Sequence, residues 1–413
     1  MRTSRGPALL ILCSAFLAAM GNGISLVALP WLVLKRTGNA VDASIVAGAA
    51  TLPLLAATLI AGTAVDFLGR RRVAMLADVL SALSVAAIPV IVLTAGLDAL
   101  NTVVLAALAA LGAFFDPAGM TARQSMLPEA AERAGWTLDH TNSLYEANFN
   151  LAYIAGPGVA GLLIAAIGAV NSMWVTAAAF AGSILAMAIL RLPQAGRPER
   201  DRRPDGVVSG VLEGLRFVWG NRVLRTLGLI DLAVTGLYLP MESVLFPKYF
   251  SDRAQPAQLG WVLMALSIGG LVGALGWTVL SRIASKRTTV LTATITFGAA
   301  SLVIGLLPPL PVILVLSTLV GLVYGPIGPI YNSVMQTRTP QELRGRVVGV
   351  MTSMAYAAGP VGFMLAGPLV DRFGLTAAFL ALAVPILAIG LVCPWIPALR
   401  ELDREPTGGG RAD

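Results

Sequence analysis

The chain has 413 residues, of which 56% are hydrophobic and only 12% are charged, and its formal net charge is +7. A water-soluble domain carries about 25% charged residues, so this composition excludes a soluble globular protein and a disordered or nucleic-acid-binding chain. The single histidine and the two cysteines, which lie in apolar runs, exclude a zinc site built on two histidines and form no metal or disulfide pattern.

Twelve apolar runs are long enough to cross a bilayer, whose hydrocarbon core needs about 20 residues per helix. The first run is too long for a cleaved signal sequence and further runs follow it, so it is predicted to be a transmembrane helix. The sequence therefore predicts an all-α integral membrane protein with 12 transmembrane helices. The predicted spans are 8–32, 43–65, 73–95, 101–121, 141–168, 171–190, 224–249, 258–280, 289–308, 311–335, 347–370 and 375–396.

The basic residues predict the orientation, because cytoplasmic loops of membrane proteins are enriched in Lys and Arg. With the N-terminus inside, 24 of the 29 Lys and Arg residues fall on the cytoplasmic side. The five that fall outside are Lys35, Arg36, Lys248, Arg253 and Arg372. We therefore expect a multi-pass protein of the plasma membrane with both termini in the cytoplasm.

Three short patterns recur six spans apart, which indicates a duplicated six-helix unit. Parallel repeats of six spans are typical of two-lobed transporters with a central cavity. The matched pairs are Tyr153–Pro157 with Tyr356–Pro360, Pro117–Gly119 with Pro326–Gly328, and Pro128–Glu129 with Pro340–Glu342.

The repeat predicts two pseudo-symmetric six-helix bundles, joined by a polar stretch and followed by a tail. The polar stretch has apolar residues at helical spacing from Val207 to Trp219, which favours a short amphipathic helix on the membrane face, with a solvated linker as the alternative. The predicted domains are an N-terminal bundle at 1–191, a cytoplasmic linker at 192–222, a C-terminal bundle at 223–400 and a cytoplasmic tail at 401–413.

The loop between the second and third spans reads Gly62-Thr-Ala-Val-Asp66-Phe-Leu-Gly69-Arg70-Arg71-Arg72, which resembles the G-x-L-x-D-R-x-G-R-R pattern of the major facilitator superfamily. The alternative is an ordinary basic turn, and a second-half copy near Gly276 to Arg287 is much weaker. An acid among bases on a tight turn can bind a helix N-terminus or an arginine in only one transport state, so the matching residues are predicted to form a cytoplasmic gate. They are Gly62, Asp66, Gly69, Arg70 and Arg71, with Phe67 departing from the usual Arg.

The fifth span contains Ala155-Gly-Pro-Gly-Val-Ala-Gly161, which resembles the G-P-x-x-G element of drug–proton antiporters in this superfamily. The resemblance implies that Gly156, Pro157 and Gly161 seal the outward path, since proline kinks a helix and glycine permits close packing. Ordinary small-residue packing is the alternative. Many of these antiporters carry an arginine within the fourth span. This chain lacks that arginine, and Arg123 is instead predicted at the cytoplasmic end of the span.

Acids inside the predicted spans are the main candidates for coupling, because a charged side chain is costly in lipid and is functional by default. Asp78 and Asp116 lie near cytoplasmic ends and are expected to pair with arginines of the inner loops. The other three, Asp231, Glu242 and Glu146, are predicted to couple proton movement to transport, with Asp231 as the main site. No phosphate-binding loop for ATP occurs, so the expected energy source is the proton gradient, with no cofactor and no metal.

Polar residues at helical spacing predict the substrate cavity. Asp231, Thr235, Tyr238 and Glu242 lie at i, i+4, i+7 and i+11, which places them on one face of a helix. Burial disfavours the charged form of a carboxylate, so a proton and a cationic drug can compete for an acid there. Hydrogen bonding between helices without a transport role is the alternative. The predicted cavity residues are Asn22, Ser25, Asn150, Tyr153, Thr235 and Tyr238.

Longer stretches, among them 117–123, 134–139, 214–219 and 343–353, are similar to the actinobacterial Tap-type multidrug efflux pumps. This resemblance implies a monomeric transporter, not an enzyme, that exports tetracycline and aminoglycosides in exchange for protons by alternating access. Its expected partners are small-molecule drugs, protons and the lipid bilayer, with no nucleic acid. The broader group also contains macrolide and siderophore exporters, so a dedicated exporter of a siderophore or other secondary metabolite is the alternative. A nutrient importer and a membrane enzyme or sensor are weaker alternatives.

Overall fold

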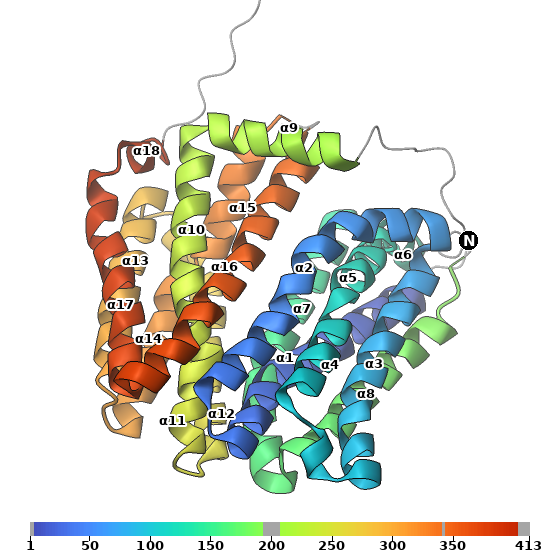
Figure 1. The fold of residues 1–413 in the computed structure, drawn as a ribbon. Helices are drawn as coiled ribbons and strands as arrows, with labels where there is room; N and C mark the ends of the chain where they lie inside the picture. Colours follow the sequence, from blue (N-terminus) through green and yellow to red (C-terminus); the bar gives the residue numbers. More distant parts are fainter. Residues whose placement is uncertain (1–3, 193–206, 341–342, 404–413) are drawn as a thin grey trace, which may run out of the picture. The chain divides into compact units, whose positions relative to one another are not determined.

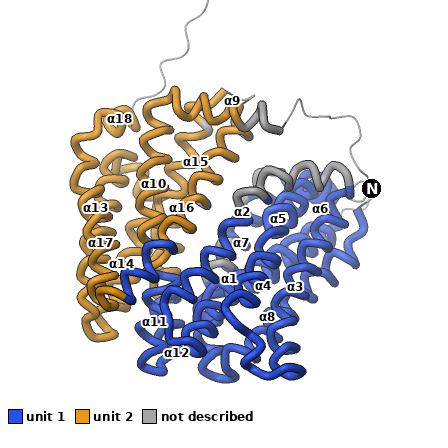
Figure 2. Tube along the Cα trace, in the orientation of Figure 1, with its two compact units in different colours: residues 1–203, 242–264, 363–371 blue, residues 204–241, 265–362, 372–413 orange. Residues whose placement is uncertain are grey.

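The computed structural model describes residues 4–192, 207–340 and 343–403 (Figure 1). Within these residues every regular element is a helix. The chain divides into two compact units, which Figure 2 colours separately. The first unit contains residues 1–203, 242–264 and 363–371, and the second contains residues 204–241, 265–362 and 372–413. The domain boundaries expected from the sequence stay a prediction.

In the first unit, α1 packs against α7 and α8, α2 packs against α4 and α5, and α3 packs against α5 and α8. The unit also includes α11 and parts of α12 and α16. Its helices are α1 (Gly6–Thr37), α2 (Ala40–Leu68), α3 (Arg70–Ala95), α4 (Thr102–Phe114), α5 (Asp116–Ser125), α6 (Leu127–Ala134), α7 (Leu138–Ile167), α8 (Ala169–Ile189) and α11 (Phe246–Ser251), with the one-turn η1 (Leu97–Ala99).

In the second unit, α13 packs against α14 and α17, and α10 packs against α15, α17 and α18. The helix α9 covers the stretch in which an amphipathic helix is expected, and Leu212, Leu215 and Trp219 are exposed on it. The helices are α9 (Val207–Gly220), α10 (Arg222–Pro240), α12 (Pro256–Leu280), α13 (Lys286–Gly305), α14 (Leu310–Tyr324), α15 (Ile327–Arg338), α16 (Arg344–Phe373), α17 (Leu375–Val392) and α18 (Pro397–Arg400), with the one-turn η4 (Cys393–Trp395).

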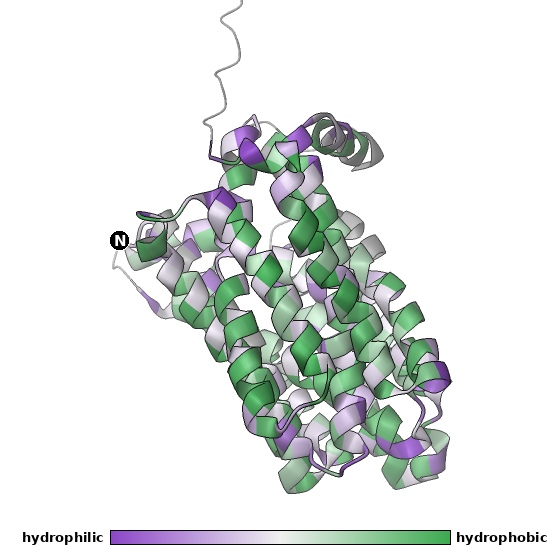
Figure 3. Cartoon of the chain, turned by 90° about the vertical axis from the view of Figure 1, so that its left-hand side faces the viewer, coloured by the Kyte–Doolittle hydropathy of each residue, from purple (hydrophilic) through white to green (hydrophobic). Residues whose placement is uncertain are grey.

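The helices are long and apolar enough to cross a membrane. In the described part of the chain, 10 helical stretches meet this condition. Two shorter apolar helices, Ala40–Leu54 and Ala155–Ile167, lie where the second and fifth spans are predicted. Figure 3 shows hydrophobic residues along the lengths of the helices and hydrophilic residues gathered toward helix ends and connections. The all-α membrane fold is therefore confirmed, whereas the count of 12 spans stays a prediction.

Large apolar side chains are exposed along these helices. Leu93 is 77% exposed, Val103 76% and Met364 77%. A soluble protein rarely exposes a large continuous apolar surface, and a helix that is hydrophobic all round is buried in protein or in lipid. The exposed side chains are the ones expected to face hydrocarbon.

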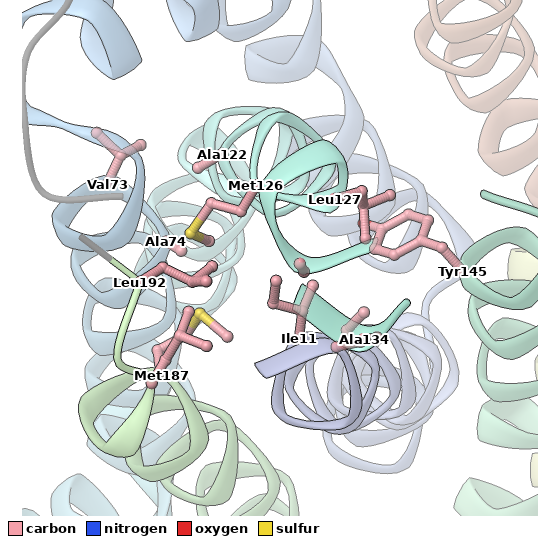
Figure 4. Close-up of a cluster of buried hydrophobic side chains, with 14 of the residues drawn as sticks. Ile11, Val73, Ala74, Ala122, Met126, Leu127, Ala134, Tyr145, Met187 and Leu192 are labelled. Atoms are coloured by element: carbon pink, nitrogen blue, oxygen red, sulfur yellow. The ribbon is translucent and has the colours of Figure 1, made fainter. Parts of the chain in front are cut away.

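A buried apolar cluster holds the first unit together at one end of its helices (Figure 4). Ile11, Met126 and Met187 are fully buried in it, and Tyr145 is 1% exposed. These side chains come from α1, α7 and α8 and from the turn between α5 and α6. Because this packing joins segments far apart in sequence, it places the polar residues of α1, α3, α5 and α8 within reach of one another.

Two predicted spans are broken at the same motif. The fourth span consists of α4 and α5, and Pro117 stands in the first turn of α5. The tenth consists of α14 and α15, and Pro326 is the N-cap residue of α15. Proline lacks a backbone N–H, so it begins a helix readily but interrupts one. In both copies the repeated Pro-x-Gly pattern therefore stands where a new helix begins.

Candidate functional site

Asp231 lies beside a group of aromatic side chains in the second unit, and we call Asp231, Thr235, Tyr238, Phe297 and Tyr324 the acid–aromatic cluster. The Tyr324 hydroxyl donates a hydrogen bond to Asp231 Oδ1 at 3.1 Å. Thr235 lies within hydrogen-bonding reach of both groups. The Phe297 ring centroid lies 4.9 Å from that of Tyr238 and 5.1 Å from that of Tyr324. The predicted Asp231, Thr235 and Tyr238 are thus brought together.

Three helices supply this cluster, and a second tyrosine supports it. Asp231, Thr235 and Tyr238 come from α10, Phe297 from α13 and Tyr324 from the last residue of α14. On α15, the Tyr331 hydroxyl donates to the backbone carbonyl of Leu227 in α10 at 3.2 Å. The break between α14 and α15 is therefore tied to α10 by tyrosine hydroxyls on both sides. The arrangement offers a proton acceptor next to ring faces, which suit flat or cationic ligands.

Glu242 does not continue the α-helical stripe of Asp231. After Pro240 the chain forms a π-helical segment, Met241–Leu245, before α11 begins. The i+11 spacing assumes an unbroken α-helix, which the structure has only as far as Pro240. Glu242 is half-buried and belongs to the first unit, whereas Asp231 belongs to the second. Single π-helical turns are frequent at functional sites.

The other predicted cavity residues lie in the first unit. Glu146 is exposed on α7. Asn22 and Ser25 are half-buried on α1, and Ser25 Oγ has no hydrogen-bond partner within the described residues. Asn150 and Tyr153 belong to α7, but their side chains lie outside the described part of the chain. The cavity role of these residues stays a prediction.

A buried ion pair and two serines join four helices of the first unit. The sequence predicts the ion pair but not the two serines. Arg123 of α5 donates from Nη2 to both carboxylate oxygens of Asp78 on α3, and both residues are less than 5% exposed. Arg123 Nε donates to Ser14 Oγ of α1 at 2.8 Å, and Ser183 Oγ of α8 lies 2.7 Å from Asp78 Oδ2. We call these four residues the buried ion-pair cluster.

Asp116 extends the polar interior next to this cluster. Its Oδ1 lies 3.2 Å from Ser81 Oγ, which also lies 3.0 Å from the carbonyl oxygen of Gly112. The predicted cavity residue Asn22 lies within hydrogen-bonding reach of the same carboxylate. The expected pairing with an arginine is confirmed for Asp78, whereas Asp116 is held mainly by neutral donors.

The predicted gate motif is described in part. Gly69 joins α2 to α3 with a φ of 86°, a conformation that glycine adopts without the strain of a side chain. Arg71 Nε donates to the carbonyl of Met187 at 2.8 Å, and its Nη2 donates to the carbonyl of Ala188. Arg71 thus caps the C-terminus of α8, where a cation is favourable. The surroundings of Gly62 and the side chain of Asp66 lie outside the described part of the chain, and Arg70 is half-buried at the start of α3.

The glycines of the G-P-x-x-G element mark two close helix contacts within the first unit. A Cβ on Gly156 would lie 2.7 Å from the Cα of Gly23 on α1, and a Cβ on Gly161 would lie 2.4 Å from the Cα of Gly260 on α12. Pro157 lies between them, inside α7. This tight packing matches the small-residue alternative and leaves the predicted sealing role untested.

Replacing Gly156 with alanine should destabilise the protein by about 1–3 kcal/mol, because overpacking at a backbone contact forces the helices apart. Gly349 is the matched control, since a Cβ there meets open space, and alanine should be neutral or stabilising by about 0.5–1 kcal/mol. Thermal unfolding of the purified variants in detergent checks this. Equal midpoints for Gly156→Ala and the wild type would contradict the contact.

No group of three or more His, Cys, Asp and Glu side chains in the described ranges is placed to hold a metal ion. The two clusters described above instead bring together carboxylates, hydroxyls, the Arg123 guanidinium and aromatic rings. Such groups can move a proton or hold a small molecule.

Comparison with known proteins identifies the family. A sequence profile described as Major Facilitator Superfamily matches residues 11–362 and 243–412. The chain belongs to the major facilitator superfamily. Among solved structures, the nucleoside transporter NupG has a fold similar to that of this chain, with a TM-score of 0.75. The two share 13% sequence identity, and the match covers 94% of this chain and 98% of NupG.

Two relatives with high sequence identity match almost the whole length of this chain. The multidrug efflux pump Tap of Mycolicibacterium fortuitum is 67% identical over 401 residues, or 97% of this chain and 98% of that protein. The multidrug efflux pump Tap of Mycobacterium tuberculosis is 64% identical over 407 residues, or 98% and 97% of the two chains. The expected resemblance to the Tap-type pumps is thereby confirmed, and the chain is a multi-pass membrane transporter.

Proposed function

We propose that this transporter exports antibiotics from the cell in exchange for protons. The observation that carries the proposal is the 67% identity with a protein named a multidrug efflux pump, over 97% of this chain. Tetracycline and aminoglycosides are the proposed substrates, on the resemblance described above.

The acid–aromatic cluster is the proposed place where proton and drug movement are coupled. Asp231 accepts a hydrogen bond from Tyr324 while its helix also presents Thr235 and Tyr238. The proton on the Asp231 carboxyl group can be exchanged for a cationic drug held against the rings, so binding of one favours release of the other. Glu242 and Glu146 are the next candidates for the same exchange.

The proposed orientation places both termini in the cytoplasm, following the excess of Lys and Arg on that side. The proposed transport cycle is alternating access, in which repeats rock around a site near the membrane midplane. The proposed functional unit is a monomer that works without a bound cofactor.

Tetracycline accumulation in a host that lacks its own efflux pumps tests the proposal. Expression of the transporter should lower the accumulated drug several-fold, and a protonophore should restore accumulation to the level of cells carrying an empty vector. Lower accumulation that a protonophore leaves unchanged would reject proton coupling. No change in accumulation of tetracycline or of an aminoglycoside would reject these drugs and favour a dedicated exporter of a siderophore or another metabolite.

A further inference from the structure

Asp116 stands at the break between α4 and α5, where both helices meet α3 within the first unit. It is the first residue of α5 and directly precedes Pro117. Its Oδ1 lies 3.2 Å from Ser81 Oγ on α3, and the same Ser81 oxygen lies 3.0 Å from the backbone carbonyl oxygen of Gly112 in the last turn of α4. Ser81 is therefore a polar link between α3 and both halves of the broken span.

The number of hydrogen atoms at this link depends on whether Asp116 is protonated. A serine hydroxyl has one hydrogen to donate, whereas an ionised carboxylate and a backbone carbonyl can only accept. If Asp116 is ionised, its carboxylate and the Gly112 carbonyl compete for the single Ser81 hydrogen, and one of the two contacts contains no hydrogen. If Asp116 is protonated, its O–H donates to Ser81 Oγ while Ser81 donates to the Gly112 carbonyl, so both contacts are hydrogen bonds.

Neighbouring donors do not supply the missing hydrogen. Ser84 Oγ, one turn further along α3, donates to the backbone carbonyl of Ser81 at 2.9 Å. The Asn22 amide of α1 lies within hydrogen-bonding reach of Asp116, but an amide can donate to a carboxyl group in either protonation state. The contact between Asp116 and Ser81 is therefore completed by a proton on Asp116 itself.

The charges around Asp116 do not balance if it is ionised. Arg123 of α5 forms its ion pair with Asp78 of α3, so two carboxyl groups face one guanidinium. Among the other helices packed against α5, α1 presents the neutral Asn22, α4 contains no charged residue, and the Asp66 side chain of α2 lies outside the described part of the chain. A carboxylate without its own cation is costly inside a membrane helix, and a proton on Asp116 removes the unbalanced charge.

Asp116 differs from Asp78 in how far the protein encloses it. Asp78 is 3% exposed, whereas Asp116 is half-buried. Asp116 also adjoins Pro117, and helices bend most readily where proline interrupts the backbone hydrogen bonds. Loss of the proton to water would leave a carboxylate and remove one hydrogen bond at this break, so it would weaken the contact of α3 with α4 and α5.

We propose that Asp116 is a second proton-carrying residue of this transporter. It holds a proton in the present arrangement of the first unit and releases the proton when the contact between α3 and the α4–α5 break opens. Asp231 exchanges a proton for the drug, whereas the proton on Asp116 controls helix packing in the first unit. The release step rests on the proposed function, since it has a role only if export uses protons.

Infrared spectra of the detergent-purified full-length transporter at neutral pH test whether Asp116 holds a proton. A protonated carboxyl group has a carbonyl band that a carboxylate lacks, and Asp116→Asn should lose such a band relative to the wild type. The matched control is Asp371→Asn, at an exposed acid of α16, which should leave the band intact. Equal bands in Asp116→Asn and the wild type would overturn the proposal.

Ser81→Ala is a second variant, which decides the question if Asp116→Asn fails to fold. It removes the oxygen that accepts the Asp116 O–H, so it should shift the same carbonyl band. A band that Ser81→Ala leaves unchanged would assign the proton to another residue and overturn the proposal.

Protonophore-sensitive tetracycline export tests whether the proton is released. Asparagine can still donate to Ser81 but cannot ionise, so Asp116→Asn should unfold within a few degrees of the wild type and lose most of this export. Asp116→Glu, which can still ionise, should retain part of it. Export by Asp116→Asn at the wild-type level would overturn the release step. A wild type without protonophore-sensitive export would instead reject the proposed function and the release step with it, while loss of the infrared band in Asp116→Asn would still assign the proton to Asp116.

Discussion

Replacing Asp231 with asparagine should abolish nearly all protonophore-sensitive drug export while leaving the fold intact. Asparagine has almost the same size, and its side-chain oxygen can still accept the hydrogen bond that Tyr324 donates at 3.1 Å. The amide cannot take up or release a proton, so a drug can no longer be exchanged for one at this position. Tetracycline accumulation with and without a protonophore measures the loss.

The matched control is Asp371→Asn, which makes the same chemical change at an exposed acid near the end of α16. This variant should export drug like the wild type, and both variants should unfold at midpoints within a few degrees of it. Export by Asp231→Asn that a protonophore still blocks would remove Asp231 from the coupling mechanism. The same assay on Glu242→Gln and Glu146→Gln would then decide between the remaining candidates.

Asp231 can be predicted from the sequence, but the full acid–aromatic cluster around it cannot, because Tyr324 comes from a distant part of the chain. Asp231, Thr235 and Tyr238 share a face of one helix, and helical spacing is sufficient to group them. Tyr324 lies 93 residues further along the chain, and only the packing of α10 with its neighbours brings the two together. No local pattern carries that information, although Tyr324 stands two residues before the Pro-x-Gly pattern that the sequence repeat identifies.

The spans themselves follow from composition, but their breaks follow from proline and helix geometry. Apolar runs predict where a helix crosses the membrane, since length and hydropathy decide this. The π-helical segment Met241–Leu245 falls inside the predicted span at 224–249. Pro240 is visible in the sequence just before it, yet proline is compatible with a kink, a break or a continued helix. The spacing that groups Glu242 with Asp231 therefore assumes an α-helix that the structure has only as far as Pro240.

Arg123 shows the opposite case, in which the residue is conspicuous but its environment is hidden. Sequence analysis places it at the cytoplasmic end of a span and expects an acid to pair with it. Its partners Asp78, Ser14 and Ser183 come from three other helices, up to 109 residues away. Serine is common inside membrane helices because it tolerates close packing, so nothing in their spacing distinguishes these two serines from the others.

Breaking the buried ion-pair cluster should produce the largest loss of stability. Arg123→Gln leaves the Asp78 carboxylate buried without its cation, which costs about 3–5 kcal/mol for a buried pair. The exposed pair of Arg346 and Glu213 is the control, and Glu213→Gln should cost less than about 1 kcal/mol. Thermal and denaturant unfolding in detergent measure both variants. A loss in Arg123→Gln no larger than that in Glu213→Gln would contradict a stabilising pair.

A double variant separates stability from transport. Replacing both partners with apolar residues of similar volume, as in Asp78→Leu with Arg123→Met, removes the unpaired charge and should recover most of the stability lost in Arg123→Gln. If the recovered protein still exports drug, the pair serves the fold of the first unit alone. If the double variant is stable but does not export drug, the charges of Asp78 and Arg123 take part in the transport cycle, because their loss then affects transport without affecting the fold.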